Sequence, residues 1–391
     1  MIERDIEETA RRLLRGFPIL TVTGPRQSGK TTLARKLFVD KPYLSLEDPD
    51  TRQLAGGDPR AFLARLPDGA VLDEIQRAPD LLSYLQTRVD ADGRMGLFLL
   101  TGSQQFGLVA GVTQSLAGRS AFLQLLPFSS AELDRAGLLT AQLDEALFAG
   151  GYPPLHDRRL APRDWFPAYV TAYVERDVRQ LLNVQDLETF QRFVKFCAGR
   201  SGQILNLSTL AADCGITHNT AKAWISVLEA SYILFLLRPH HANFNKRLVK
   251  SPKLYFLDTG LLCWLLGIQQ ADQLATHPLR GAIFETWVVA ELVKARFNQG
   301  LPLNMHFWRD SHGNEVDVIA DMAGNWLPIE IKAGQTLNRD FTAGLERWSA
   351  LAGERAVRPA LVYGGGASMI HQGIRVRAWR DAATLLASQA G

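Results

Sequence analysis

One stretch near the N-terminus constrains the fold of this chain more than any other. The run "PILTVTGPRQSGKTTLARKL" (18–37) consists of an apolar strand, then Gly24-x4-Gly29-Lys30-Thr31, then a helix. Glycines let the backbone curl so that its N–H groups face phosphate oxygens, and a helix N-terminus adds a positive dipole. The order of strand, glycine loop and helix therefore predicts a triphosphate cradle at the edge of a parallel sheet.

The pattern also assigns chemical roles within this loop. Lys30 would reach the β- and γ-phosphates, and the Thr31 hydroxyl would bind Mg²⁺. ATP and Mg²⁺ are therefore the expected cofactors. The alternative is a glycine turn that precedes a lysine by chance. The residues expected to line the nucleotide are Gly24, Pro25, Arg26, Gln27, Ser28, Gly29, Lys30, Thr31 and Thr32.

Two later strands end in polar residues that would complete such a site. "AVLDEIQ" (70–76) delivers Asp73, which could hold Mg²⁺ through water, and Glu74, which could polarise the attacking water. "LFLLTGSQQ" (97–105) ends in Thr101 and Ser103, placed to lie between those acids and the γ-phosphate. Two structural alternatives stay open: the acids mark only a helix N-terminus, and Ser103 is a plain helix cap.

Three regimes of sequence pattern divide the chain. Residues 1–150 alternate short apolar runs with helix-like stretches, which predicts an α/β domain with a largely parallel sheet. Residues 151–270 are mainly helical, and residues 271–391 place a helix before strand pairs. With 391 residues, 47% of them hydrophobic, the chain is long and apolar enough to form real cores in each region.

Charge balance, cysteine spacing and the length of apolar runs limit the class of protein to be expected. Because 43 basic residues nearly balance 40 acidic ones, nucleic-acid binding would have to come from local patches. The three cysteines form no CxxC pair, which indicates a reducing compartment without structural zinc. No apolar run approaches the roughly 20 residues that a membrane span needs. The expectation is a cytoplasmic protein without a membrane partner.

The middle region carries a second pattern. "LSTLAADCGITHNTAKAWISVLEASYILFLLRPH" (207–240) predicts a helix, a turn at Gly215 and a second helix, similar to a helix-turn-helix with strands around a wing. Residues 231–257 contain five cations and no acid, which is where a nearly neutral protein could contact DNA phosphates. Packing or partner docking is the alternative role. The cations are Arg238, Lys246, Arg247, Lys250 and Lys253.

"NEVDVIADMAGNWLPIEIKAG" (314–334) contains two short strands whose charged residues alternate with apolar ones. Pairing the strands would bring Asp317, Glu330 and Lys332 together on one face. Two carboxylates can hold a divalent metal, and the lysine can orient water or stabilise charge on a phosphate. The alternative is a surface hairpin with a Glu–Lys pair.

Glu285 adds a third acid. In "LRGAIFETWVVAELVKARF" (279–297), helical spacing puts it on the same stripe as Val288, Val289 and Leu292. A carboxylate among apolar neighbours is costly unless a cation or a metal pairs with it. Glu285 is therefore a candidate third ligand, and a partly exposed helix acid is the alternative.

The phosphate loop, the Asp73–Glu74 pair and the polar-tipped strand resemble the AAA+ superfamily of ATPases. "LAGRSAFLQLLPFS" (116–129), "GGYP" (150–153), "AYVERDV" (172–178) and "NFNKRLVKSPKLYFLDTGLL" (243–262) extend the resemblance to predicted prokaryotic ATPases with a C-terminal domain of unknown function. The resemblance implies that Arg119 senses the γ-phosphate, in its own subunit or across to a neighbour in a homo-oligomer. A solvated arginine before a strand is the alternative.

The C-terminal stretch resembles the PD-(D/E)XK nuclease core, with Val316 where the signature proline would stand. Helices that precede this core often contribute a glutamate, which implies the same role for Glu285. Many lineages of this fold keep the scaffold and lose turnover, so the resemblance implies the fold more strongly than cleavage.

The patterns together predict an α/β protein in which a P-loop domain is joined through a helical and winged-helix region to a nuclease-like domain. It would bind and hydrolyse ATP with Lys30, Glu74 and Arg119, and couple the nucleotide state to the C-terminal domain, on DNA in one version. Two rivals remain: an ATP-gated, metal-dependent DNA endonuclease, and a non-catalytic signalling or docking ATPase.

Overall fold

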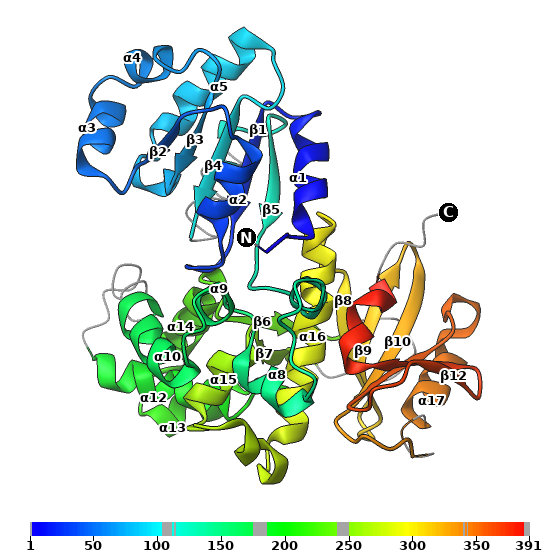
Figure 1. Cartoon of the computed structure of the whole chain (residues 1–391). Helices are drawn as coiled ribbons and strands as arrows, with labels where there is room; N and C mark the ends of the chain where they lie inside the picture. The colour runs from blue at the N-terminus through cyan, green and yellow to red at the C-terminus, as the bar shows by residue number, and fades with distance from the viewer. Residues whose placement is uncertain are drawn as a thin grey trace. The chain divides into compact units, whose positions relative to one another are not determined.

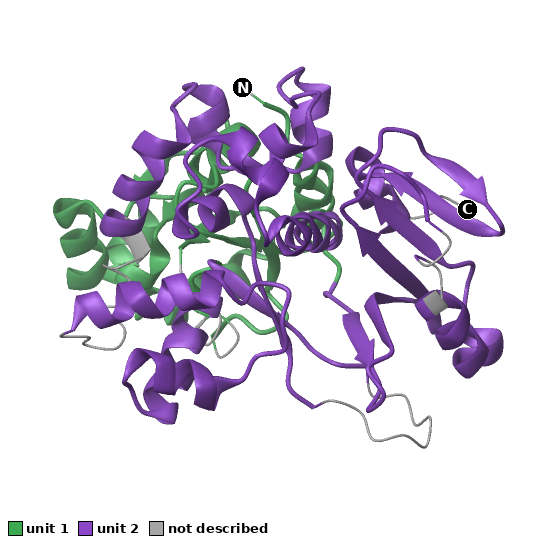
Figure 2. Ribbon diagram, turned by 90° about the horizontal axis from the view of Figure 1, so that it is seen from below, with its two compact units in different colours: residues 1–128, 230–232, 297–301 green, residues 129–229, 233–296, 302–391 purple. Residues whose placement is uncertain are grey.

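A computed structural model describes residues 2–103, 112, 115–174, 186–240, 250–338, 341 and 343–386. The chain folds as two compact units, which Figure 2 colours separately. The first comprises residues 1–128, 230–232 and 297–301, and the second comprises residues 129–229, 233–296 and 302–391. Within the described ranges, no helix is both long and apolar enough to cross a membrane.

The first unit is built on a five-stranded sheet in the order β2-β3-β4-β1-β5, and every pairing in it is parallel (Figure 1). The α/β class expected for this region is thereby confirmed. β4 separates the phosphate-loop strand β1 from β3, which carries the acidic pair. The strands are β1 (Ile19–Thr23), β2 (Tyr43–Ser45), β3 (Ala70–Asp73), β4 (Phe98–Gly102) and β5 (Ser120–Gln124).

Both faces of this sheet are buried, because alternate residues of each strand point to opposite sides. Leu20 and Leu99 pack with residues of α1 and α2, while Leu72 and Leu100 pack with residues of α4 and α5. The central strands therefore form near-continuous apolar runs. The helices of this unit are α1 (Ile6–Leu14), α2 (Lys30–Leu37), α3 (Pro49–Gly57), α4 (Pro59–Ala64), the 3-10 turn η1 (Ile75–Arg77) and α5 (Leu81–Asp92).

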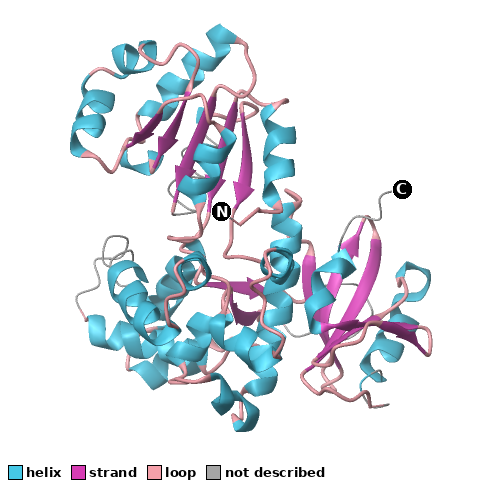
Figure 3. Cartoon of the chain, in the orientation of Figure 1, coloured by secondary structure: helices cyan, strands magenta, loops and turns pink. Residues whose placement is uncertain are grey.

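The second unit begins with a largely helical region (Figure 3), in which α13, a turn at Gly215 and α14 follow one another as the sequence predicted. α13 ends at Gly215, whose φ of 68° lies in the left-handed region where glycine has no steric penalty. Trp224 of α14 is buried, and the rings of Phe190 and Phe193 pack edge-on against it at 5.2 and 5.1 Å. The elements are α7 (Ser130–Arg135), α8 (Leu143–Ala149), α9 (Pro153–Asp157), α10 (Pro162–Tyr169), η2 (Val170–Val174), α12 (Leu187–Ala198), α13 (Leu207–Cys214), α14 (His218–Ala230), α15 (Thr259–Leu265) and η3 (Ala271–Thr276).

Two antiparallel strands, β6 (Leu234–Leu237) and β7 (Lys253–Phe256), follow the helix-turn-helix. The segment between them, residues 241–249, lies outside the described residues and includes Lys246 and Arg247 of the predicted DNA contacts. The flanking Arg238 and Lys250 are exposed.

The C-terminal part of the second unit is a mixed sheet in the order β12-β13-β11-β10-β9-β8. β8, β9 and β10 pair antiparallel, whereas β11 pairs parallel with both β10 and β13. Trp348 of α17 is buried against one face with Trp308. The elements are α16 (Arg280–Asn298), β8 (Met305–Arg309), β9 (Glu315–Met322), β10 (Asn325–Lys332), α17 (Ala343–Ala352), η5 (Gly353–Arg355), β11 (Ala360–Tyr363), β12 (Met369–His371), β13 (Ile374–Ala378) and η6 (Trp379–Leu386).

The regions expected as separate domains at 151–270 and 271–391 are continuous in this unit. The chain that leaves β6 pairs with β8: His240 donates its amide to the Phe307 carbonyl at 2.7 Å, and Phe307 donates to the Arg238 carbonyl at 3.1 Å. Buried Glu291 of α16 accepts from the amide and hydroxyl of Ser130, both at 2.7 Å. Packing therefore crosses the sequence position near 270, while the first unit comprises residues 1–128 together with the short segments 230–232 and 297–301.

Shortening a side chain at the centre of the first sheet should destabilise this unit. Leu99 of β4 is fully buried, so Leu99→Ala should lower the free energy of unfolding by about 2 to 5 kcal/mol through lost burial and the cavity left behind. Equilibrium urea unfolding followed by circular dichroism measures the change. Leu54→Ala is the matched control, because Leu54 lies in the same unit and is 53% exposed. It should change stability by no more than about 0.5 kcal/mol.

Candidate functional site

The loop from Gly24 to Gly29 has the curled backbone that its sequence predicted. Gly24 has a φ of 149°, and a Cβ there would lie 2.1 Å from the Leu125 carbonyl oxygen. Gln27 has a φ of 60°, a strained value for a residue with a side chain, and Gly29 has a φ of 96°. α2 starts directly after Gly29 with no side-chain cap, so its first amides face the loop.

Lys30 lies across this loop. Its ammonium donates to the carbonyl oxygens of Gly24 at 3.0 Å and Pro25 at 2.8 Å. The residue is only 6% exposed, so burial of its stem leaves the charged end at the loop. A positive charge held against backbone oxygens is suited to exchange those partners for phosphate oxygens, which form stronger charge-assisted bonds.

Arg4 fixes the loop from the N-terminal segment. It donates from Nη1 to the Ser28 carbonyl at 2.9 Å and from Nη2 to the Leu126 carbonyl at 2.7 Å, and its guanidinium lies 4.6 Å from the centre of the Phe128 ring. The fully buried Ser28 hydroxyl has no hydrogen-bond partner among the described residues. An orphaned hydroxyl inside a phosphate-type loop is consistent with a bound anion as its partner.

Asp73 lies at the end of β3, and its carboxylate is a shared hydrogen-bond acceptor in the site. Its carboxylate accepts from the hydroxyls of Thr31 at 3.3 Å, Tyr43 and Thr101. Burial, and next the hydrogen bond to Asp73, raise the pKa of Tyr43 to about 12, so Tyr43 remains a donor at neutral pH. Side chains from β2, β4 and the start of α2 therefore converge on one carboxylate.

Glu74 adopts a left-handed backbone with a φ of 55°. Its carboxylate accepts from Ser103 at 3.2 Å and from the Gln76 amide, and its own N–H donates to the Thr101 hydroxyl at 3.3 Å. Strained backbone of this kind persists where the surroundings hold it, as they do at functional sites. The end of β4 thus positions Glu74 beside Asp73.

This arrangement fits Mg²⁺ and a nucleotide. The Thr31 hydroxyl and the Asp73 carboxylate are 3.3 Å apart, and both are oxygen donors of the kind that Mg²⁺ prefers. Of the remaining predicted loop residues, Arg26 pairs with Glu47 at 3.7 Å, while Gln27 and Thr32 are exposed.

The structure does not bring Arg119 to the phosphate loop of its own chain. Arg119 precedes β5 at the opposite end of the sheet, because β1 and β5 run parallel with Ile19 beside Ser120. The four residues of strand from there to Thr23 span about 13 Å. Arg119 forms a two-point ion pair with Asp90, at 2.6 and 2.8 Å. Sensing within the same subunit therefore does not fit, and contact across to a neighbouring subunit stays a prediction.

Four further residues touch the site without having been predicted: Arg4, Tyr43, Gln76 and Tyr232. The hydroxyls of Tyr232 and Thr23 share a hydrogen bond of 2.6 Å immediately before Gly24. Gln76 could have been suspected, because it follows the acidic pair by two residues. The others lie far from the motif in sequence, and no local pattern marks them.

In the second unit, the two strands of the nuclease-like pattern pair as expected. Ile329 lies opposite Val318, a register that places Glu330 next to Asp317. Asp317 accepts from the Ile331 amide at 2.8 Å, and Lys332 donates to Glu330 Oε1 at 2.5 Å. Glu330 Oε2 is buried without a hydrogen-bond partner among the described residues. The acids and the lysine of the pattern are thus brought together.

Lys253 links Glu285 to the cluster of Asp317 and Glu330 by contacting both Glu285 and Asp317. Lys253 donates to Glu285 Oε1 at 3.0 Å, contacts Glu315, and lies 3.8 Å from Asp317 Oδ1. Its side chain is 4% exposed. The expectation that Lys253 contacts DNA is therefore wrong, because a buried ammonium among three carboxylates cannot reach a phosphate backbone.

The pKa values of Asp317 and Lys253 are both raised, but for different reasons. Burial, and next the charges of Glu285 and Glu330, raise the pKa of Asp317 well above its usual range. Burial opposes the charge of Lys253, but Glu285, Asp317 and Glu315 outweigh it and raise the pKa of Lys253. Across the described parts of the chain, no group of three or more acidic, histidine or cysteine side chains is arranged to hold a metal ion.

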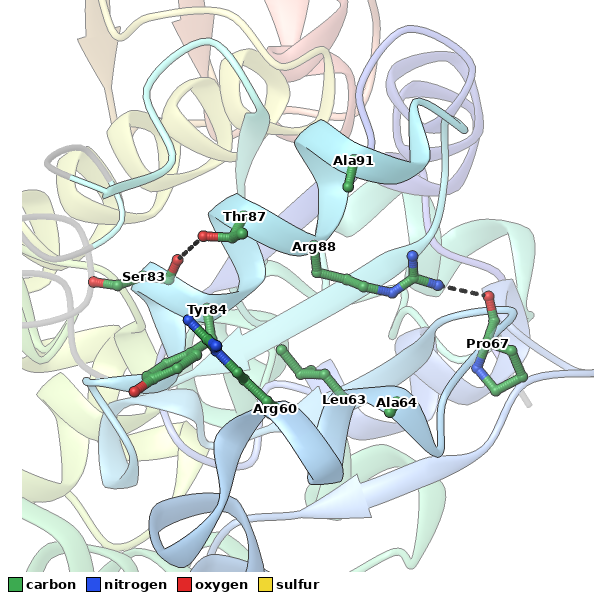
Figure 4. A pocket seen from close by; sticks show the side chains of 9 residues that line it. All are labelled: Arg60, Leu63, Ala64, Pro67, Ser83, Tyr84, Thr87, Arg88 and Ala91. Carbon is green, nitrogen blue, oxygen red and sulfur yellow. Dashed lines mark hydrogen bonds between the residues drawn. The ribbon is translucent and has the colours of Figure 1, made fainter.

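A separate cavity lies between α4 and α5 of the first unit (Figure 4). It has a volume of about 730 Å³ and is lined by Arg60, Leu63, Tyr84 and Arg88 among others. Arg88 is held toward the Pro67 carbonyl at 3.0 Å. No predicted nucleotide ligand lines this cavity, so it is distinct from the phosphate loop.

Comparison with known proteins assigns families to three segments. An AAA domain matches residues 16–133, a domain of unknown function (DUF8612) matches residues 140–272, and another (DUF4143) matches residues 280–379. The uncharacterized proteins Mb2031c of Mycobacterium bovis and Rv2008c of Mycobacterium tuberculosis are each 33% identical over 369 residues, covering 93% of this chain and 80% of the relative. The Walker-type ATPase PABY2304 of Pyrococcus abyssi is 14% identical, covering 68% of this chain and 96% of that one, with a TM-score of 0.47.

Disrupting the curl of the loop should weaken the binding of nucleotide. Gly24→Ala would place a methyl group against the Leu125 carbonyl, so the loop must open and lose its inward amides. Affinity for a fluorescent ATP analogue should fall roughly tenfold or more, the equivalent of one lost charge-assisted bond.

Gly56→Ala is the matched control, because a Cβ at Gly56 meets nothing within 4 Å and its φ is ordinary. That variant should bind the analogue as the unaltered protein does. Equal affinities for the two variants would contradict the role given to the curl.

Proposed function

Because this chain belongs to a family of P-loop ATPases that join an AAA domain to a C-terminal domain of unknown function, we propose that it binds and hydrolyses ATP and couples the nucleotide state to its second unit. One observation carries the proposal: the Asp73 carboxylate lies 3.3 Å from the Thr31 hydroxyl, beside the curled loop. These two side chains come from the start of α2 and from the end of β3, which are far apart in the sequence.

Binding follows from the groups that line the loop. Lys30 would exchange the carbonyls of Gly24 and Pro25 for the β- and γ-phosphates, and the first amides of α2 would face the same oxygens. Thr31 and Asp73 would hold Mg²⁺, directly and through water. When bound, Mg²⁺ would neutralise negative charge on the phosphates.

Hydrolysis requires a group that orients water in line with the γ-phosphate. Glu74 is that group, since Ser103 and Gln76 fix its carboxylate at the end of the sheet where the phosphate loop opens. Thr101 holds both Asp73 and the Glu74 amide, so metal ligand and base are positioned by the same hydroxyl. Glu74 would accept the proton of the attacking water.

Coupling would run through the segment 230–232. Tyr232 follows α14 directly in the chain, belongs to the first unit, and shares its hydroxyl hydrogen bond with Thr23, the residue before Gly24. A change in the loop on nucleotide binding would therefore act on the end of the helix-turn-helix.

Two substitutions should separate binding from hydrolysis. Lys30→Ala removes charge-assisted bonds worth about 1.5 to 3 kcal/mol, so ATP affinity should drop tenfold or more. Glu74→Gln keeps the shape and loses the base, so affinity should persist while kcat falls about 10²- to 10⁴-fold. Calorimetric titration and phosphate release measure the two quantities.

Lys36→Ala is the control for loss of a positive charge on the same helix, because Lys36 pairs with Glu7 at 2.6 Å away from the loop. It should leave both quantities near those of the unaltered protein. Unchanged ATP binding in Lys30→Ala would end the proposal.

DNA contact is a second candidate function, favoured by the helix-turn-helix geometry and the exposed Arg238 and Lys250. With Lys253 removed from the set, four cations remain, two of them outside the described residues. The slope of log affinity against log salt should then be roughly −3.6, at about −0.9 for each phosphate contact.

Fluorescence anisotropy with a labelled duplex checks this slope, and Lys250→Ala should make it shallower by about 0.9. Binding that is absent or insensitive to salt would instead favour partner docking by the second unit.

A further inference from the structure

The nuclease-like core of the second unit contains a buried cation of its own. Lys253 of β7 reaches carboxylates from two other elements: Glu285 on α16, and Glu315 and Asp317 on β9. At 4% exposure, its side chain is nearly as buried as the apolar core. Positions 253 and 255 share one face of β7, and Tyr255 also donates to Glu285, at 2.5 Å. Two side chains on one face of β7 therefore donate hydrogen bonds to Glu285.

Each carboxylate that would bind a metal is already engaged. Glu285 accepts from Lys253 and Tyr255, and Asp317 lies beside Lys253 through one oxygen and accepts the Ile331 amide through the other. Glu330 holds Lys332 through Oε1, and its Oε2 is buried without a hydrogen-bond partner among the described residues. An ion that takes about six oxygen ligands would have to displace these partners.

A divalent cation and this ammonium compete for the same space and the same charges. Mg²⁺ bonds to oxygens at about 2.1 Å and would have to lie between Glu285 and Asp317. Lys253 Nζ is within 3.8 Å of both, so the two cations would repel each other at close range in a buried region. Removing the lysine, by contrast, would leave the buried Asp317 and the half-buried Glu285 and Glu315 without their shared partner.

We propose that Lys253 is the resident cation of the nuclease-like core, occupying the position that a divalent metal would need. The core therefore binds no divalent metal between Glu285 and Asp317 and does not cleave DNA. It serves as a folded module of the second unit, with the lysine from the strand after the helix-turn-helix tying that region to the C-terminal sheet. Every residue that carries the inference lies in the second unit, so it is independent of nucleotide binding.

The test counts Mn²⁺ sites on the full-length, nucleotide-free protein by electron paramagnetic resonance. The unaltered protein and Lys253→Arg, which keeps the charge, should show no Mn²⁺ site that depends on Asp317. Lys253→Met keeps the stem and removes the charge, so it should gain one Mn²⁺ site. That site should disappear in the double variant Lys253→Met/Asp317→Asn. Lys195→Met is the matched control and should gain no Mn²⁺ site, because it makes the same change at an exposed lysine of the same unit.

Thermal unfolding supplies a second measurement. Without metal, Lys253→Met should melt roughly 5 to 20 °C below the unaltered protein, because buried acids lose their counter-ion. Millimolar Mn²⁺ should recover at least half of that loss, and recover none in the double variant.

Two results would overturn the proposal. One is a Mn²⁺ site, or cleavage of DNA with Mg²⁺ or Mn²⁺, that the unaltered protein shows and the folded Asp317→Asn variant loses. The other is a folded Lys253→Met protein that gains no Mn²⁺ site.

Discussion

The carboxyl edge of the parallel sheet is the constraint on which the first unit depends. β4 lies between β1 and β3, so the Thr101 hydroxyl at its tip meets Asp73 and the Glu74 amide. Thr31 and Tyr43 reach the same carboxylate from the start of α2 and from β2. An acid that satisfies donors from three other elements holds their relative positions, since moving any one leaves a polar group unpaired.

The second unit also contains a buried lysine, but the groups that pair with its charge are different. At the phosphate loop, Lys30 rests on backbone carbonyls that a ligand can replace, so its charge remains available. In the second unit, Lys253 contacts carboxylates whose own charges would be left unpaired without it. Neutral carbonyls lose little when a cation leaves, whereas buried carboxylates lose a great deal. Lys30 is therefore placed where its charge could bind a ligand, whereas Lys253 stabilises the fold.

Much of the fold and of the phosphate site was predictable, because their signals are local. The strand, loop and helix around Gly24, the acidic pair after β3 and the turn at Gly215 each occupy one continuous stretch. The β9–β10 pairing followed from alternation along two adjacent strands. Arg4, Tyr43 and Tyr232 were missed, since each contacts the loop or its metal-ligand acid from a distant stretch of sequence. Arg119 was misjudged for its own subunit, because its distance from the loop depends on which end of β5 it occupies.

The sequence by itself determined the phosphate loop, the acids that face it and the alternating strands of the C-terminal core, because backbone curl and side-chain alternation are short-range properties. It also showed that Glu285 needed a positive partner. Only the tertiary structure decided that this partner is Lys253, which the sequence places in a basic run suited to DNA. The reason is physical: a charge is attractive to any opposite charge, and only the packing of β7 against α16 and β9 fixes which one it meets in the low-dielectric interior.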